Sequence, residues 1–285
     1  MPLPESTPQD SRAGAELARL LAIMRALRDP VAGCPWDIAQ DFASIAPYTL
    51  EEAHEVADVI ARAAWSELPG ELGDLLLQVV FHARIAEERG LFGFADVARA
   101  ISTKMLDRHP DIFEAAHAAP RPLNAAARSV AWEAAKARER AAAGSGTLDG
   151  VALALPALTR AVKLQARAAR VGFDWPETDD VLDKLAEEAR EVQQARAEKD
   201  PAHLAEEVGD LLFVVANLAR HLGVDPEAAL RGANAKFTRR FARIEALLAT
   251  TGRGPVDSTL AEMDDLWNRA KAEERAARDD VAQDA

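Results

Sequence analysis

Residues Glu187 to Asp210, EEAREVQQARAEKDPAHLAEEVGD, predict two helices that fold back on each other about a turn at Lys199. Counted outward from Lys199, the acids form two matched pairs, eight residues away and eleven residues away on either side: Glu191 with Glu207, and Glu188 with Asp210. An antiparallel hairpin therefore places the members of each pair level with one another. The i,i+3 spacing along each helix also puts both of its acids on one face. The sequence thus predicts four carboxylates that converge on one side of the hairpin.

The turn of this hairpin has a sequence signal of its own. Asp200 and Pro201 directly follow Lys199. Asp is a favoured residue at the N-cap of a helix, and Pro fits the first helical position because its missing N–H would be unpaired there in any case. The second helix of the hairpin is therefore expected to begin here.

The same arrangement of acids occurs a second time in the chain. A set with the same internal spacing lies 136 residues earlier: Glu52, Glu55, Glu71 and Asp74. Its turn is expected near Ala63, by analogy with Lys199. A tandem duplication of one helical unit explains this long repeat better than a short-period solenoid does.

Clustered carboxylates next to buried helix need a cation. Two of them about 4 Å apart repel each other by roughly 4 kcal/mol at an effective dielectric constant of 20. A donor set made only of oxygens favours Mg²⁺, with Mn²⁺ possible, over zinc. Glu51 and His54 form an E-x-x-H pair that could belong to a di-iron bundle, but Arg190 takes the place of His54 in the second copy. We therefore expect His54 to be exposed.

The composition predicts an all-α protein, because Ala, Leu, Glu and Arg are abundant whereas the chain has one Tyr and few β-branched runs. The formal net charge is −13, from 34 basic and 47 acidic residues, which argues against nucleic acid or anionic membrane as a partner. Cys34 is the only cysteine, and the N-terminal residues lack the basic and apolar regions of a signal peptide. We expect a cytoplasmic protein.

The repeat predicts two helical domains of about four helices each. We expect a disordered lead-in at 1–12, an N-terminal helical domain at 13–143, a linker at 144–150, a C-terminal helical domain at 151–279 and a frayed tail at 280–285. The linker is placed at Gly144-Ser145-Gly146, the most linker-like tripeptide of the chain. In the first domain, an acidic helix is expected after Pro47, and the turn GCPWD from Gly33 is expected to present Trp36.

A basic helix face follows the second acidic hairpin and consists of Lys236, Arg239 and Arg240. Such a face can be an ordinary solvated surface. Across from metal-bound carboxylates, it would instead neutralise the remaining charge of a polyphosphate. Trp267 is open to either a core position or base stacking, and Asn217 is expected to be a solvent-facing amide.

Several motifs resemble those of the MazG family. In the first half they are GCPWD from Gly33, LEEAHE from Leu50, ELGDLLLQVVFHAR from Glu71 and RHP from Arg108. In the second half they are LPALTRAVKLQ from Leu155, VGFDW from Val171, EEVGDLLF from Glu206 and KFTRRF from Lys236. The resemblance covers roughly residues 17–275 and is specific in aggregate.

The resemblance implies an all-α, Mg²⁺-dependent nucleoside triphosphate pyrophosphohydrolase, which converts a (d)NTP to the monophosphate and pyrophosphate. It also implies a homodimer or larger homo-oligomer, with helices of two subunits around each site. The metal-binding role carries over to the four acids of the second hairpin and, by the repeat, to those of the first. Substrate contacts would fall on six residues: Lys184, Lys236, Arg239, Arg240, Trp267 and Lys271.

The expected chemistry is attack of a metal-activated water on the α-phosphorus, since a bound divalent cation lowers the pKa of its water. The catalytic set is Glu188, Glu191, Glu207 and Asp210. Either Glu188 or Glu191 could act as the base toward the water instead of as a ligand, and the spacing alone leaves this open.

The first half departs from the pattern of the family. Gly70 stands where Glu206 supplies an acid in the second half, and Pro69-Gly70 is expected to weaken the start of the helix that bears Glu71. Gln40-Asp41-Phe42 also replaces the Q-T-H found in many members. We therefore expect catalysis at the second hairpin and a degenerate or regulatory first copy.

Two other functions remain open at the level of sequence. The same acidic hairpin can serve a pyrophosphatase specialised for phosphoribosyl-ATP or for dUTP. A non-catalytic helical dimer that senses nucleotides is the alternative from a different class. House-cleaning of damaged nucleotides and control of alarmone pools are the physiological roles that the resemblance suggests.

Overall fold

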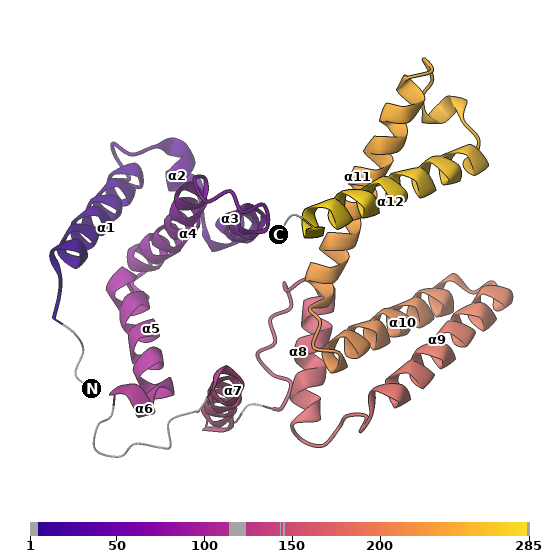
Figure 1. Cartoon of the computed structure of the whole chain (residues 1–285). Coiled ribbons are helices and arrows are strands. Elements are labelled where there is room, and N and C mark those ends of the chain that lie inside the picture. Colours follow the sequence, from indigo (N-terminus) through magenta and orange to yellow (C-terminus); the bar gives the residue numbers. More distant parts are fainter. Residues whose placement is uncertain (1–4, 114–123, 143, 145, 284–285) are drawn as a thin grey trace. The chain divides into compact units, whose positions relative to one another are not determined.

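The structure is a computed structural model that describes residues 5–113, 124–142, 144 and 146–283. The elements of this described part are all helices, so the all-α prediction is confirmed. The chain divides into two compact units, Met1–Glu139 and Arg140–Ala285 (Figure 1). None of the described helices is long and apolar enough to cross a membrane.

The first unit is built around a hairpin of two long helices. Its helices are α1 (Pro8–Leu27), α2 (Pro35–Ala39), α3 (Phe42–Ala61), α4 (Leu68–Glu88), α5 (Phe94–Arg108), α6 (Pro110–Phe113) and α7 (Ala125–Ala142). Helices α3 and α4 form the hairpin, and α1 and α5 pack against α4. The buried cluster of this unit comprises Met24, Ile45, Val80, Phe81 and Ile85.

The second unit repeats this plan. Its elements are α8 (Ala157–Ala169), α9 (Thr178–Glu198), α10 (Pro201–His221), α11 (Pro226–Ala249), the short 3₁₀ helix η1 (Pro255–Asp257) and α12 (Leu260–Gln283). Helices α9 and α10 form the second hairpin, α8 packs against α10, and α12 packs against α11. Figure 1 shows α11 and α12 as a second pair that extends away from the α9–α10 hairpin.

Both hairpins turn at the predicted residue. Lys199 adopts the left-handed conformation, with φ of 59°, and Ala63 does the same with φ of 53°. Asp200 caps α10 by accepting hydrogen bonds from the backbone N–H groups of Ala202 and His203. The two turns therefore share a backbone conformation at positions 136 residues apart, as the repeat predicts.

Three helices extend beyond the predicted boundaries, in two cases because a cap was overlooked. Helix α1 begins at Pro8 within the expected lead-in, since Thr7 and Asp10 form a reciprocal capping box. Helix α3 begins at Phe42, since Asp41 and Ser44 form a second capping box. Pro47 therefore lies inside this helix and not before it. Helix α12 continues to Gln283, into the expected frayed tail. The first four residues of the lead-in, residue 145 of the linker and the last two residues of the tail lie outside the described part.

The start of α4 is less perturbed than Pro69-Gly70 predicts. Pro69 lies in the first turn of the helix, where its missing N–H removes no intrahelical hydrogen bond. The N-cap residue Glu67 makes no side-chain cap, in contrast to Asp200 at the start of α10. Both helices of the first hairpin are therefore formed, but α4 lacks the side-chain N-cap that stabilises the start of α10.

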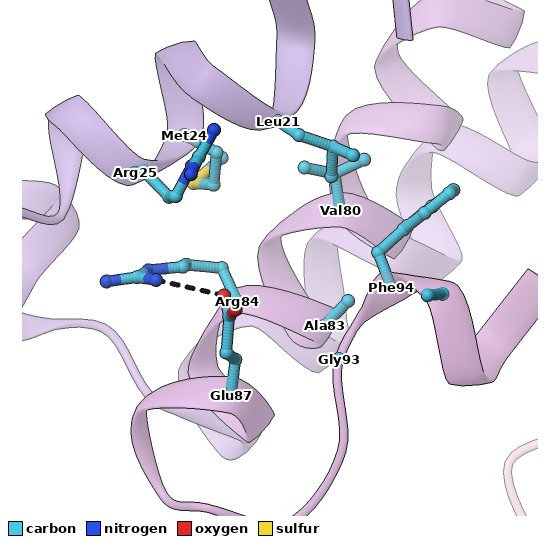
Figure 2. Close-up of a pocket in the computed structure, with 10 residues that line it drawn as sticks. Leu21, Met24, Arg25, Val80, Ala83, Arg84, Glu87, Gly93 and Phe94 are labelled. Carbon is cyan, nitrogen blue, oxygen red and sulfur yellow. Dashed lines mark hydrogen bonds and ion pairs between the residues drawn. The ribbon is translucent and has the colours of Figure 1, made fainter. Parts of the chain in front are cut away.

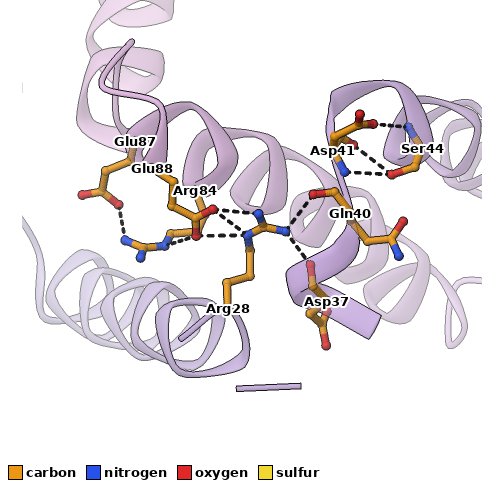
Figure 3. A network of polar contacts seen from close by, with 8 residues as sticks. All are labelled: Arg28, Asp37, Gln40, Asp41, Ser44, Arg84, Glu87 and Glu88. Atoms are coloured by element: carbon orange, nitrogen blue, oxygen red, sulfur yellow. Dashed lines mark hydrogen bonds and ion pairs between the residues drawn. The ribbon is translucent and has the colours of Figure 1, made fainter. Parts of the chain in front are cut away.

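Buried Arg28 fixes the GCPWD turn against the core of the first unit (Figure 3). Its guanidinium donates to both carboxylate oxygens of Glu88, at 2.7–3.1 Å, and to the backbone carbonyls of Asp37 and Gln40. Gly33 is required in this turn because a Cβ there would overlap backbone atoms of Leu27 and Asp29. Trp36 is 53% exposed, as expected, but it lies in the short helix α2 and not in a turn, because Pro35 fits the first helical position.

Candidate functional site

Three of the four acids of the second hairpin meet closely. Glu188 on α9 and Glu207 and Asp210 on α10 each offer a carboxylate oxygen, and these oxygens lie within 4.8 Å of one another. Glu188 is only 5% exposed, and its Oε2 is buried without a hydrogen-bond partner among the described residues. A buried oxygen of this kind costs free energy unless a donor or a cation contacts it. The arrangement fits a divalent cation that prefers oxygen ligands.

Lys184 supports this group from within α9. Its Nζ lies 2.8 Å from Oε1 of Glu188 and 2.6 Å from Oε1 of Glu187. The two carboxylates raise the pKa of Lys184, so the ammonium remains charged at neutral pH. Lys184 thus neutralises one oxygen of Glu188 and leaves the other to a further partner.

Glu191, the fourth acid, is outside the tight group. Burial raises the pKa of its carboxyl group, and the negative charges of Glu188 and Glu207 act in the same direction, while Lys184 opposes them. Glu191 is therefore close enough to the other acids to be affected by them. Its raised pKa makes it a stronger base than an ordinary glutamate.

The first hairpin forms a corresponding group from Glu52, Glu55 and Glu71, with Asp74 exposed beside it. Burial raises the pKa of Glu52, and repulsion by Asp74 and Glu55 adds to this shift. Burial, followed by the charge of Glu55, raises the pKa of Glu71 in the same way. Two members of this group, Glu52 and Glu71, are the repeat equivalents of Glu188 and Glu207, whereas the third member is Glu55 in the first hairpin and Asp210 in the second.

One difference between the two groups is a buried amide in the first. Gln78 donates from Nε2 to Oε1 of Glu52 at 3.4 Å, and its own Oε1 is buried without a described hydrogen-bond partner. Val214 takes the equivalent position in the second hairpin. His54 is exposed, as expected, and does not belong to the acidic group that the described residues form.

The six predicted substrate residues divide between two helix pairs. Lys184 lies on α9, whereas Lys236, Arg239 and Arg240 lie on α11 and Trp267 and Lys271 on α12. Helices α11 and α12 pack on each other and extend away from the α9–α10 hairpin (Figure 1).

Cations and aromatic rings meet where α11 packs on α12. Arg239 and Arg240 donate to the two oxygens of Glu274, at 2.8 and 2.9 Å. The Arg240 guanidinium also lies 5.3 Å from the centroid of the Trp267 ring. Lys236 is exposed, and the structure gives it no ion pair among the described residues. This end of the unit therefore offers positive charge beside an indole.

Sequence reasoning was wrong about Asn217. It is 2% exposed, and its Oδ1 accepts hydrogen bonds from Nε and Nη2 of Arg220, at 3.0 and 2.7 Å. Arg220 in turn pairs with Asp174 in the GFDW turn. The Arg at i+3 is the signal that could have indicated this pairing. Sequence reasoning also overlooked His203, which contacts Glu207 with its Nε2 at 3.0 Å.

A cavity of about 300 Å³ lies in the first unit, apart from the acids (Figure 2). Apolar side chains that include Leu21, Val80 and Phe94 line one part of it, and Arg25, Arg84 and Glu87 line another. Arg84 is already paired with Glu87 at 2.9 Å. The lining shows no group that would perform chemistry.

Comparison with known proteins identifies the class to which this fold and acidic site belong. The MazG nucleotide pyrophosphohydrolase domain matches the chain twice, over residues 40–113 and 177–243. Each match contains one acidic hairpin. The family that the motifs indicate is therefore found in both halves.

Three relatives cover most of this chain. A nucleoside triphosphate pyrophosphohydrolase of Escherichia coli K12 is 48% identical over 262 residues, which span 91% of this chain and 98% of that protein. The nucleoside triphosphate pyrophosphohydrolase/pyrophosphatase MazG of Thermotoga maritima is 40% identical, over 91% of this chain and 97% of that protein. A nucleoside triphosphate pyrophosphohydrolase of Mycobacterium tuberculosis is 33% identical, over 90% of this chain and 66% of that protein. The chain belongs to the MazG family of nucleotide pyrophosphohydrolases.

Proposed function

We propose that this protein is a metal-dependent nucleoside triphosphate pyrophosphohydrolase whose active site is the α9–α10 hairpin. The observation that carries the proposal is the buried, unpartnered Oε2 of Glu188 beside the carboxylates of Glu207 and Asp210. Family membership supports the reaction, which is hydrolysis of a (d)NTP to the monophosphate and pyrophosphate.

Glu188, Glu207 and Asp210 would hold the metal, with Mg²⁺ the preferred ion and Mn²⁺ a substitute. When bound, such an ion lowers the pKa of a coordinated water and offsets phosphate charge. We assign the role of base to Glu191, because its carboxylate lies outside the tight group of three that would hold the metal. Glu188 is less suited to that role, since Lys184 already pairs with it.

We propose that the cations of the α11–α12 pair act on the hairpin of a second copy. Lys236 and Arg240 would stabilise the charge that develops on the leaving pyrophosphate, with Arg239 and Lys271 beside them. Trp267 would stack on the base. The support for a second copy is that the two helices that carry these residues extend away from the hairpin of their own chain (Figure 1).

A repeated apolar stripe supports the homodimer. Val208, Leu212 and Val215 share one face of α10 and are 40%, 52% and 40% exposed. Leu72, Leu76 and Val79, exactly one repeat earlier on α4, are 48%, 40% and 36% exposed. Apolar side chains at i, i+4 and i+7 form a continuous face that normally packs against another helix. We propose that a second copy of this chain covers both stripes.

The acidic net charge supports free nucleotides, and not nucleic acid, as the substrate, and with one cysteine it supports a cytoplasmic location. The test is incubation of the purified chain with Mg²⁺ and each of the common NTPs, phosphoribosyl-ATP or dUTP, with the nucleotide and phosphate products resolved by chromatography. We expect a monophosphate plus pyrophosphate. Release of orthophosphate, or the same activity in Glu207→Gln, would refute the proposal. Binding without turnover would favour the nucleotide-sensing dimer.

A further inference from the structure

His203 lies between two carboxylates at the turn of the α9–α10 hairpin. Its Nε2 is 3.0 Å from Oε1 of Glu207, one turn further along α10. Its Nδ1 is 3.0 Å from Oε2 of Glu198, the last residue of α9. The imidazole therefore bridges the two helices and contacts one member of the tight acidic group.

We propose that His203 is a positioning residue for Glu207, which holds this carboxylate in the orientation that a divalent cation needs. The contact uses Oε1 of Glu207, whose carboxylate belongs to the group with Glu188 and Asp210. Groups that hydrogen-bond to a metal ligand without touching the metal fix its orientation, and their loss typically costs about 10- to 100-fold in metal affinity. The inference rests on the proposed function, because the orientation of Glu207 matters only if Glu207 binds metal.

Glu198 orients the imidazole ring of His203. Because it holds the Nδ1 side of the ring, the Nε2 side faces Glu207. His203 is 37% exposed in its side chain, whereas Glu207 is 15% exposed, so the ring lies on the solvent side of the ligand it orients. A residue in this place can restrain Glu207 without occupying the metal site.

The first hairpin carries opposite charges at the same two places. Arg62 and Glu67 lie 136 residues before Glu198 and His203, and they pair with each other at 2.8 Å. Glu67 therefore adds a negative charge near Glu71, whose pKa it raises after the larger effects of burial, Glu55 and Asp74. Among the described residues, His203 links Glu198 to Glu207 in the second hairpin. At the equivalent positions of the first hairpin, Arg62 and Glu67 form an ion pair with each other instead.

The test is Mn²⁺ binding to the full chain, followed by the electron paramagnetic resonance signal of free Mn²⁺. Every protein compared carries Glu52→Gln and Glu71→Gln, so that the first acidic group does not contribute. His203→Ala is expected to raise the Kd for Mn²⁺ about 10-fold. His203→Gln retains an N–H donor and should recover part of the loss. Glu67→Gln alters the repeat-equivalent position and is the matched control, with an unchanged Kd expected.

A structural role for His203 and a failed metal site give different results. If His203→Ala lowers the Tm but leaves the Kd unchanged in protein shown to be folded by circular dichroism, the positioning role is refuted. An equal loss of affinity in Glu67→Gln would also refute it, because the effect would not depend on the bridge. If the parent binds Mn²⁺ no better than Glu207→Gln does, the proposed metal site itself fails.

Discussion

The guanidinium of Arg240 lies 5.3 Å from the centroid of the Trp267 ring, and Arg108 lies 4.8 Å from Trp132 at the equivalent place in the first half. In both halves this cation–π contact joins a basic helix to the helix that carries the tryptophan. Contacts of this kind contribute about 0.5–1 kcal/mol at exposed sites and more where they are desolvated. They hold the indole and the cation side by side, which is the arrangement that our proposal needs for contact with a base and its phosphates.

Replacing Trp267 by Ala should therefore weaken substrate binding more than it slows chemistry. Stacking of a base on an aromatic ring is worth about 1–3 kcal/mol, so we expect KM for NTPs to rise about 10-fold with a small change in kcat. Trp267→Phe keeps a ring and should lose less. Steady-state kinetics at saturating Mg²⁺ provide the measurement, with Trp132→Ala as the control in the other half. An unchanged KM in Trp267→Ala would show that the ring serves packing alone.

Equivalent substitutions in the two hairpins should have unequal effects. We expect Glu207→Gln to lower kcat by at least about 100-fold, because it removes a charged ligand from the group that includes Glu188. Glu71→Gln changes the residue one repeat earlier and should leave most of the turnover intact. Pyrophosphate release measured for both variants tests this asymmetry. Loss of turnover in Glu71→Gln alone would move the active site to the first half.

The ion pair of Arg28 and Glu88 should stabilise the first unit in a pH-dependent way. Hydrogen bonds from Arg28 hold the pKa of Glu88 below its ordinary value of 4.5. Because the folded pKa is lower than the unfolded one, this stabilisation is complete above pH 4.5 and is lost as the pH falls through the folded pKa. Arg28→Ala leaves Glu88 paired with Arg84 but removes the buried guanidinium that also donates to the carbonyls of Asp37 and Gln40, so we expect a loss of about 2 kcal/mol in the free energy of unfolding at neutral pH.

Hydrogen exchange of peptides from α1 and α4, measured between neutral pH and pH 3, would follow this unit separately from the second. Glu88→Gln should exchange faster than wild type at neutral pH, and the difference should shrink in acid. The exposed Glu16→Gln on α1 is the control. A difference that persists unchanged in acid would contradict the assigned cause.

A charge in the apolar stripe of α10 should dissociate the proposed oligomer. Leu212 is 52% exposed in the single chain, and Leu212→Glu would place a carboxylate where a second copy is expected to pack. Analytical ultracentrifugation should show a smaller species than wild type. Val256→Glu adds the same charge at a residue that is 95% exposed in η1, and it should leave the assembly unchanged. Identical sedimentation of Leu212→Glu and wild type would show that this stripe is not the interface.

Much of the fold could be predicted because each hairpin carries its own local signals. The spacing of acids about Lys199, the Asp200-Pro201 cap and the repeat at Ala63 fixed the turns to single residues. Helices α1 and α3 begin earlier than the apolar spacing predicts, at Pro8 and Phe42, because capping boxes stand upstream of the first apolar residues of the pattern.

The site was predictable in part for a related reason. Acids on one helix face follow from spacing along the chain, so the two groups could be expected. The bridge of His203 to Glu198 depends on side-chain directions at the turn, which spacing does not give. In our proposal Lys236 meets the acids of a second copy, and the spacing of residues along one chain does not encode a distance between two chains.

The left-handed residue at each hairpin turn has a consequence for insertions and deletions. In an α-helix one residue corresponds to a rotation of about 100°. Adding one residue between Lys199 and Asp200 would therefore turn Glu207 and Asp210 away from Glu188, even if both helices remained intact. The turn thus sets the rotational phase of α10 relative to α9. Its length is therefore constrained by the convergence of carboxylates that lie outside the turn itself.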